Sequence, residues 1–334
     1  MPFAKDLSII VPGRNEQFMR HTIEDVLAHA KADTEVIAVC DASWPEPPIA
    51  DHPKVKLLHT TTPVGQRAAT NLGAQISRAK YICKLDAHCS VDEGFDTKMI
   101  AKMQPDYTMI PMMHRLEAFN WCCTDCGERH YQGSKPTKCG NEECKCTEFS
   151  MIMVWQPRFN KGATVSWRFD EELHFQYWRQ HKKREEVKKQ AESGIIPTLT
   201  CIGACFLMER ERFWELGGMQ EGHGSWGQYG VELALSAWLS GGKMVTCLDT
   251  WFAHMFRTTN FAQNGESSWP YKISQRDINK ARKYSRDMWL NNAWPKQKYP
   301  LSWLLEKFWP IRGWTDDALK KQKERDRDFT PAQQ

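Results

Sequence analysis

Short apolar segments with strand composition alternate with helical patterns through the first 90 residues of the chain. The strand segments are 7–12, 35–39, 55–60 and 81–85, and the helical segments between them are 20–32 and 66–79. Strands that alternate with helices through short loops predict an α/β fold with a mostly parallel sheet flanked by helices. Ligands of such sheets bind outside the carboxyl ends of the strands, so polar residues that follow these strands are candidates for a site.

Two metal-ligand side chains follow the fourth strand segment, YICKL. Asp86 and His88 are two positions apart, so an extended chain directs both side chains to the same face. A carboxylate and an imidazole on one face suit a transition-metal or manganese ion. The alternative is an ordinary aspartate at a strand end next to a structural histidine.

Composition indicates an ordinary soluble chain with a sizeable core. Hydrophobic residues make up 41% of the 334 residues and charged residues 26%. No run approaches the roughly 18 apolar residues of a membrane span, and the N-terminus lacks the long apolar region of a secretion signal. We therefore expect a cytoplasmic protein without a membrane partner, in which the 12 cysteines are metal ligands or buried thiols. The sequence does not specify an oligomeric state.

Charge is distributed unevenly along the chain. The segment from Lys272 to the C-terminus has 15 Lys and Arg against 8 Asp and Glu, whereas the preceding residues have 30 against 33. This basic, tryptophan-containing tail is expected to form helices, with the LLEKFW segment packed on the body. An anionic partner and a solvated helical face are both compatible with the tail.

A cysteine-rich segment at 121–149 predicts a zinc site. Six of the 12 cysteines lie in NWCCTDCGERHYQGSKPTKCGNEECKC, and two pairs of them resemble the knuckles of a zinc ribbon. Four thiolates form a tetrahedral structural site, whose metal supplies folding energy that the polar filler does not. The favoured ligands are Cys123, Cys126, Cys139 and Cys144, with Cys122, Cys146 and His130 as substitutes.

The other six cysteines lie in or beside apolar strands and are expected to be buried. Strand-like segments frame the cysteine-rich segment, which therefore appears as an outgrowth of the sheet. Residues 168–193 have the charge pattern of a long, solvated helix. Three tryptophans near these segments have two interpretations, the border of an acceptor cleft or core packing: Trp155, Trp167 and Trp178.

The first half of the chain resembles glycosyltransferase family 2, which has the GT-A fold. The resemblance rests on IIVPGRNE, VCDASW and PVGQRAATNLGAQISRAKYICKLDAHC. It implies that Asp86 and His88 form a metal motif in the D-x-H variant of the polypeptide N-acetylgalactosaminyltransferases. It also implies a nucleotide-binding set in which Pro12, Arg14 and Glu16 line the uridine pocket, Asp41 holds the base or ribose, and Arg67 and Asn71 lie near the diphosphate.

Residues 197–257 resemble the same transferases. The shared skeleton comprises a PT opening, a Gly-Ala pair, FWELGG, WG, a glutamate six residues before a tryptophan, GG and H-x-x-R. The resemblance implies that His254 is the third ligand of a divalent cation, Mn²⁺ or Mg²⁺, and that Arg257 contacts the diphosphate. It places Gly203, Ala204 and Trp226 against the donor sugar.

One departure from the family pattern concerns the catalytic base. The family has an acidic pair two residues after WG, whereas this chain has Tyr229 and Gly230, and its next carboxylate is Glu232. Inverting transfer needs a base near the acceptor hydroxyl. Glu232 is therefore either the catalytic base or a charge at a helix N-terminus. Without a base, a retaining mechanism is favoured, so the stereochemistry stays open.

These observations predict a metal-dependent glycosyltransferase that uses a nucleotide sugar, most simply a UDP-sugar. The cysteine-rich segment and the W-G-Q-x-G-x-E stretch at 226–232 resemble those of bacteriophage enzymes that glycosylate hydroxymethylated bases. With the basic tail, this resemblance favours a 5-hydroxymethylpyrimidine in double-stranded DNA as the acceptor. The alternatives are a polysaccharide, a protein Ser/Thr hydroxyl, or a zinc-ribbon nucleic-acid-binding protein on an inactive transferase fold. The expected units are a nucleotide-sugar half at 1–120, the zinc insert at 121–149, an acceptor half at 150–260 and the helical extension at 261–334.

Overall fold

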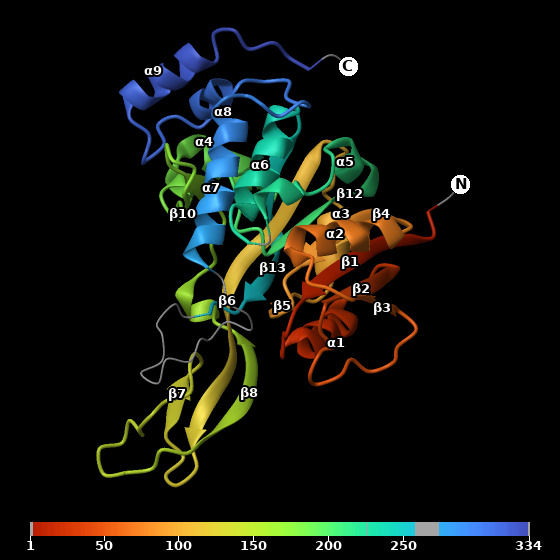
Figure 1. Ribbon diagram of the computed structural model, residues 1–334, viewed down its shortest axis with the longest axis vertical. Helices are drawn as coiled ribbons and strands as arrows, with labels where there is room; N and C mark the ends of the chain where they lie inside the picture. Colours follow the sequence, from red (N-terminus) through yellow and green to blue (C-terminus); the bar gives the residue numbers. More distant parts are fainter. Residues whose placement is uncertain (1–2, 225, 258–273, 333–334) are drawn as a thin grey trace.

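The computed structural model describes residues 3–224, 226–257 and 274–332. A sheet runs through the body, a three-stranded arm projects from one end, and the C-terminal helices pack at the other end (Figure 1). Within the described residues, no helix is long and apolar enough to cross a membrane.

The N-terminal half forms the parallel part of the sheet. Its strands pair in the order β4-β1-β2-β3, and all three pairings are parallel. The strands are β1 (Lys5–Gly13), β2 (Thr34–Asp41), β3 (Val55–Thr60) and β4 (Ala79–Leu85), and the helices are α1 (Met19–His29) and α2 (Gly65–Ile76). Each of these six elements lies where the sequence predicts it, although α1 ends three residues before the predicted Ala32.

Close packing of α2 on the sheet depends on a glycine. A Cβ on Gly73 would lie 2.5 Å from Cγ2 of Ile10 on β1 and 3.3 Å from Cγ2 of Val39 on β2. The helix backbone therefore lies directly on two buried strands. This contact fixes the distance between α2 and the sheet. The start of α2 borders a cavity at the carboxyl ends of the strands.

The second half extends the sheet through one antiparallel strand. Strand β12 lies between β4 and β6 and is antiparallel to both, whereas β6 and β13 are parallel to each other. The bounds of these elements are β5 (Cys89–Val91), α3 (Phe95–Ile100), β6 (Tyr107–Cys123), β11 (Ile195–Pro197), β12 (Cys205–Glu209), α5 (Arg210–Glu215), α6 (Tyr229–Leu239) and β13 (Lys243–His254). Helices contact the sheet along its length, which confirms the predicted α/β class with a mostly parallel sheet flanked by helices.

The arm is an extension of β6 beyond the body. The far half of β6 pairs antiparallel with β7 (Arg129–Tyr131) and with β8 (Phe149–Pro157) (Figure 1). The cysteine-rich segment at 121–149 begins at the end of β6, includes β7 and reaches the start of β8, at the end of this arm. The two predicted strand-like flanks are thus β6 and β8.

The long helix predicted at 168–193 is wrong. The chain instead forms a hairpin of β9 (Trp167–Phe169) and β10 (Phe175–Tyr177), a 3-10 turn at His181–Lys183 and a short helix, α4 (Glu185–Ala191). The side chain of Asp170 accepts hydrogen bonds from the backbone N–H of Glu172 (3.1 Å) and His174 (2.9 Å). These bonds stabilise a turn in place of a helix, and the aromatic residues on either side favour strands.

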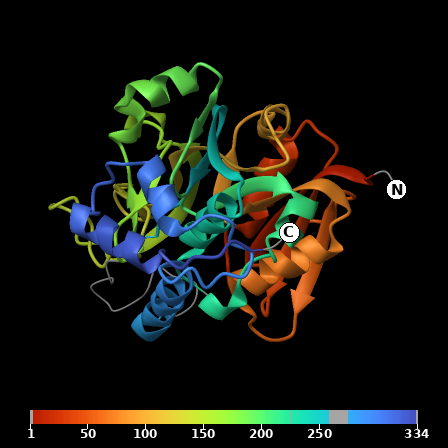
Figure 2. The same cartoon turned by 90° about the horizontal axis from the view of Figure 1, so that it is seen from above.

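The C-terminal segment packs on the body through three helices: α7 (Gln275–Trp289), α8 (Leu301–Lys307) and α9 (Asp316–Arg325). Its apolar side chains belong to the main core, and α8 contacts α6. Figure 2 shows the C-terminal helices, in blue, on the side of the molecule away from the red and orange N-terminal strands. The fully buried members include Trp289, Leu301, Leu304, Leu305 and Phe308. The packing predicted for the LLEKFW segment is confirmed, whereas residues 261–273 of the predicted extension lie outside the described residues.

Stability is expected to fall between pH 6.5 and pH 4 because of His181. Its ring stacks on Trp178 (4.5 Å between ring centroids) and bonds to the Ser166 hydroxyl (2.8 Å). Burial and the nearby Arg184 lower the pKa of His181 to about 4. The unfolded chain, with an ordinary histidine pKa near 6.5, therefore binds the proton first, and the stabilisation is lost as pH falls through this window.

The expected loss is roughly 3 kcal/mol, since each unit of pKa difference corresponds to about 1.4 kcal/mol. Denaturant unfolding at pH 7.5 and pH 4.5 measures it. Carboxylates also titrate there, so the decisive quantity is the difference between the native chain and the His181→Asn variant. If the two chains differ in free energy of unfolding by the same amount at pH 7.5 and at pH 4.5, His181 is not the source of the pH dependence.

Candidate active site

One cavity of about 390 Å³ opens at the carboxyl ends of β1, β2 and β4. It lies where polar residues that follow parallel strands converge, as an open α/β sheet requires. Most of the residues predicted for the donor site line this cavity: Pro12, Arg14, Glu16, Asp41, Asp86, His88, Gly203, Trp226, His254 and Arg257.

Asp86, His88 and His254 meet in this cavity because of strand pairing. Asp86 follows β4, and its backbone N–H donates to the carbonyl of Ala204 (2.8 Å). Strand β5 pairs antiparallel with the end of β13, where Cys89 is opposite His254. This register brings His254 beside His88, although 166 positions separate them in the sequence.

The three side chains direct ligand atoms at one point. Nε2 of His254 lies 3.1 Å from Nε2 of His88 and 3.3 Å from a carboxylate oxygen of Asp86. The potential ligand atoms of the three residues all lie within 4.8 Å of one another. Two imidazole nitrogens that face each other and a carboxylate form a set that a cation stabilises.

The protonation states suit a metal ligand set. Burial lowers the pKa of His254 to about 4, so the ring is neutral at pH 7 and has a lone pair to offer. Burial also acts to raise the pKa of Asp86, but the Lys84 charge and the hydrogen bond with His254 outweigh it and hold this pKa well below its ordinary value. One carboxylate and two imidazoles suit Mn²⁺ better than Mg²⁺, which prefers oxygen ligands alone.

Glu16 orients the imidazole ring of His88. Its carboxylate accepts from Nδ1 of His88 (3.1 Å) and pairs with Arg257. Burial acts to raise the pKa of Glu16, yet His88 and Arg257 lower it overall. A carboxylate that holds the second ring nitrogen of a ligating histidine is a common support of metal sites. Glu16, predicted as a nucleotide contact, therefore also fixes the position of His88.

Lys84 and Gln66 are two site residues that the sequence-based interpretation missed. Lys84 is fully buried, and its ammonium group donates to Asp86 and to the carbonyl of Gly203 (2.8 Å). Gln66 donates to the same carboxylate oxygen of Asp86 at 2.6 Å. Lysine is almost never fully buried without a partner, so a single lysine inside an apolar strand was the available signal.

Asp41 lies in the cavity and organises the start of α2. Its carboxylate accepts from the backbone N–H of Val64 (2.6 Å) and of Gly65 (3.0 Å). The carboxylate has further lone pairs to offer, so a hydroxyl or a base N–H can still bind to it. Gly65 adopts a φ of 85°, which a residue without Cβ tolerates most easily.

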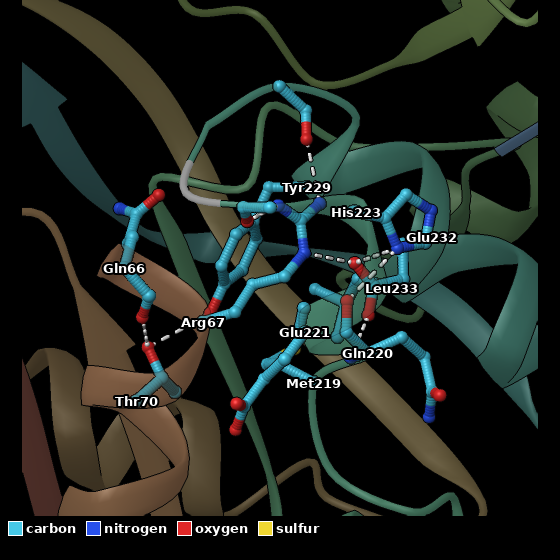
Figure 3. Close-up of polar contacts among 12 residues, drawn as sticks. Gln66, Arg67, Thr70, Met219, Gln220, Glu221, His223, Tyr229, Glu232 and Leu233 are labelled. Carbon is cyan, nitrogen blue, oxygen red and sulfur yellow. Dashed lines mark hydrogen bonds and ion pairs between the residues drawn. The ribbon is translucent and has the colours of Figure 1, made fainter. Parts of the chain in front are cut away.

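Arg67 and Glu232 do not line the cavity and instead form a buried ion pair. Nε of Arg67 lies 2.6 Å from Glu232, and the side chains are 1% and 2% exposed. The same guanidinium donates to the carbonyls of Gly224 (3.1 Å) and Gly227 (2.7 Å), which precede α6. Figure 3 shows Arg67 of α2 directed at Glu232 of α6. His223 lies 3.4 Å from the carboxylate of Glu232.

This geometry corrects two predictions. Arg67, predicted near the diphosphate, holds the turn that precedes α6, on which Trp226 lies. Glu232, predicted as catalytic base, has its carboxylate engaged by Arg67 and by the backbone N–H of Gln220. The physical reason is charge compensation, because two opposite charges buried together must pair with each other.

Asn71 and Ala204 are also placed differently from the prediction. The amide of Asn71 exchanges hydrogen bonds with the backbone of Met219 (2.9 and 3.0 Å), away from the cavity. Ala204 is buried behind the site and contributes its carbonyl to Asp86. Both residues support the site and do not line the cavity.

Aromatic residues form part of the cavity lining. Phe175 and Tyr177 extend from β10 into the lining, together with Trp226 and Phe256. Of the three tryptophans considered from the sequence, Trp167 and Trp178 are buried in the core, and Trp155 donates to Asp25 (3.0 Å). The hairpin at 167–177, which was predicted as helix, therefore supplies aromatic residues to the cavity.

The arm carries a second cluster of potential metal ligands. The thiols of Cys123, Cys126, Cys139 and Cys144 lie within 4.8 Å of one another, as the favoured prediction requires. The backbone N–H groups of Cys126 and Asp125 lower the pKa of Cys123 to about 6, which favours the thiolate that a metal binds. The six cysteines outside the arm are buried, as predicted.

Mutation of this cluster is expected to remove one zinc ion per chain. Cys126→Ser should abolish zinc retention and make the 121–149 segment sensitive to protease, because its polar filler has little core of its own. Elemental analysis and limited proteolysis measure both effects. Cys146→Ser is the matched control, since the Cys146 thiol bonds to Thr124 (3.3 Å) and Glu148 (3.3 Å) and lies outside the four-thiol group. Equal zinc loss in both variants would contradict this assignment.

Comparison with known proteins gives the same family for the first part of the chain. Residues 8–120 match the model of glycosyl transferase family 2. The chain is 24% identical over 263 residues to polypeptide N-acetylgalactosaminyltransferase 10 of Homo sapiens, a match that covers 75% of this chain and 38% of that protein. Polypeptide N-acetylgalactosaminyltransferase 8 of Drosophila melanogaster is 26% identical over 236 residues, which cover 68% of this chain and 33% of the relative. The chain thus spans well under half the length of these curated relatives.

Two solved structures share the fold. GalNAc-T7 with UDP, GalNAc and Mn²⁺ has a TM-score of 0.58 at 16% identity, covering 96% of this chain and 54% of that chain. S. aureus TarS 1-349 with UDP-GlcNAc has a TM-score of 0.50 at 13% identity, covering 97% and 73%. The likeness confirms the predicted GT-A fold.

Proposed function

We propose that this chain, whose residues 8–120 match glycosyl transferase family 2, transfers a sugar from a UDP-sugar to an acceptor hydroxyl. The observation that carries the proposal is the convergence of Asp86, His88 and His254 inside the cavity that Asp41 and Arg257 also line. One solved structure of the same fold, whose title specifies UDP and Mn²⁺, supports the same donor and cation.

The cavity residues have distinct roles in this reaction. Pro12, Arg14 and Asp41 hold the nucleoside, and Gly203 and Trp226 border the donor sugar. Asp86, His88 and His254 would hold a Mn²⁺ ion, which would supply Lewis-acid stabilisation to the departing diphosphate. Glu16 keeps the ring of His88 in position, and Arg257 adds a positive charge near the diphosphate.

We infer that the transfer proceeds with retention of anomeric configuration. The carboxylates among the described cavity residues are Glu16, Asp41 and Asp86, and each one already accepts hydrogen bonds on the donor side. An inverting reaction needs a base beside the acceptor. With retention, the acceptor proton passes to an oxygen of the departing diphosphate. Proton NMR of the first product anomer tests this, and an inverted product would refute it.

The proposed acceptor is a 5-hydroxymethylpyrimidine in double-stranded DNA, as the resemblance to bacteriophage enzymes suggests. Helix α7 supports it: Arg276, Lys280 and Lys283 are exposed there, and Tyr284 of the same helix contacts His223 (4.7 Å between ring centroids), just before the turn that carries Trp226. Lys and Arg there suit DNA phosphates, and an extruded base suits the aromatic side of the cavity. The second candidate, a protein Ser/Thr hydroxyl, is favoured by the names of the polypeptide-modifying relatives.

One experiment separates these acceptors. The protein is incubated with Mn²⁺, a panel of UDP-sugars, and either hydroxymethylpyrimidine-containing DNA or a Ser/Thr-rich peptide. Mass spectrometry of the nucleosides and of the peptide then shows which acceptor gains a hexose, an N-acetylhexosamine or a pentose. A peptide product alone would refute the DNA acceptor. Absence of UDP binding with Mn²⁺ present would refute the transferase and favour the nucleic-acid-binding alternative on an inactive fold.

A further inference from the structure

Lys84 is a buried cation directly behind the metal-ligand group. It lies on β4 with no exposed surface, and its ammonium group contacts Asp86, the carbonyl of Gly203 and the face of the Tyr229 ring (4.8 Å). Lysine is rarely enclosed in this way unless its charge is compensated. The compensating charge here is Asp86, the one acidic member of the ligand group.

The charges around the ligand group therefore cancel in pairs. Asp86 is paired with Lys84, and Glu16, which supports His88, is paired with Arg257. His88 and His254 add lone pairs but no negative charge when neutral. A divalent cation that enters this group alone meets no net negative charge, whereas most protein sites for hard divalent cations supply one or more uncompensated carboxylates.

Lys84 and Gln66 also place the two carboxylate oxygens of Asp86 in different surroundings. Both donate to Oδ1, whereas Oδ2 is the oxygen that lies next to His254. Oδ1 is thereby occupied by two donors, and Oδ2 remains as the single oxygen that faces both imidazoles. Asp86 can therefore offer one oxygen, Oδ2, to a cation. Lys84, on the other side of the carboxylate, neutralises much of its negative charge.

We propose that Lys84 is a positioning residue that makes cation binding depend on the nucleotide diphosphate. This inference rests on the proposed function. With Lys84 in place, the diphosphate supplies the negative charge that the protein ligands lack, so the cation and the nucleotide bind together and each strengthens the binding of the other. The same ammonium group binds the carbonyl of Gly203. It thereby fixes the position of the donor-sugar side of the cavity relative to Asp86.

The test measures Mn²⁺ affinity by calorimetry and by the electron paramagnetic resonance signal of free Mn²⁺, with and without UDP. In the native chain, UDP should strengthen Mn²⁺ binding by about tenfold or more, in the usual range of coupling between sites. Lys84→Met should bind Mn²⁺ alone about tenfold more tightly than the native chain does, and the effect of UDP should shrink correspondingly. Lys80→Met is the matched control, because Lys80 is an exposed lysine on the same strand.

Lys84→Gln provides a second variant at the same position. Its amide N–H group can donate to Asp86 in place of the ammonium group while the positive charge is removed, so it should also raise the affinity for Mn²⁺ alone. If Lys84→Met does not fold, as judged by circular dichroism, Lys84→Gln decides the question. Native-like Mn²⁺ affinity in the folded variants would overturn the role of Lys84 while leaving the transferase proposal intact. Absence of any joint binding of Mn²⁺ and UDP in the native chain would instead refute the proposed function itself.

Discussion

Asp86→Asn should lower UDP-sugar turnover by about three orders of magnitude while the chain stays folded. Asparagine keeps an oxygen that accepts from Lys84, so the buried ammonium group retains a partner. The substitution removes the one negative charge among the three ligands that converge in the cavity. Loss of that charge weakens the metal site and with it the stabilisation of the departing diphosphate. Release of UDP from a UDP-sugar, followed with Mn²⁺ at saturating donor, measures the effect.

Asp92→Asn is the matched control for this experiment. Asp92 also follows a strand of the sheet, is partly buried, and accepts from Lys98 (2.7 Å) and Thr250 (3.1 Å), but it does not line the cavity. We expect its turnover to remain within about threefold of the native value, since it acts only on stability. Turnover by Asp86→Asn at the level of this control would show that the metal-ligand group is not catalytic.

Arg67→Met should destabilise the chain by about 3–5 kcal/mol, because it leaves the buried carboxylate of Glu232 without its partner. Three hydrogen bonds from Arg67 are lost at once: one to Glu232 and two to the carbonyls of Gly224 and Gly227 (Figure 3). Denaturant unfolding measures the loss. The exposed pair Lys5–Asp33, also 2.6 Å apart, is the control, and Lys5→Met should change the free energy of unfolding far less than Arg67→Met does.

Glu232→Gln distinguishes a structural role of this pair from a catalytic one. If Glu232 is structural, as its burial and pairing indicate, the variant loses stability, and turnover measured on the folded fraction falls modestly. The double variant Arg67→Met/Glu232→Gln should then recover part of the stability that Arg67→Met loses, because no unpaired charge remains. Complete loss of turnover in Glu232→Gln with unchanged stability would restore Glu232 as catalytic base.

The sequence alone predicted the parallel half of the sheet and two groups of residues that the fold brings together: the pair Asp86 and His88, and four cysteines of the arm. These features depend on local patterns: the strand segment at 35–39 is apolar from Val36 to Val39, Asp86 and His88 are two positions apart, and the favoured cysteines occur as two close pairs. Periodicity and spacing are properties of neighbouring residues, so they can be interpreted without knowledge of the fold. His254 was found only because the resemblance extended to 257.

Only the tertiary structure decided which charges face the cavity and which face one another. Arg67 and Glu232, 165 positions apart, neutralise each other under the turn that carries Trp226, and Lys84 neutralises Asp86 from inside the sheet. The hairpin at 167–177 likewise depends on side-chain bonds of Asp170 that outweigh a helical charge pattern. A sequence shows which groups are charged, but the cost of burying a charge depends on the partner that the fold places beside it.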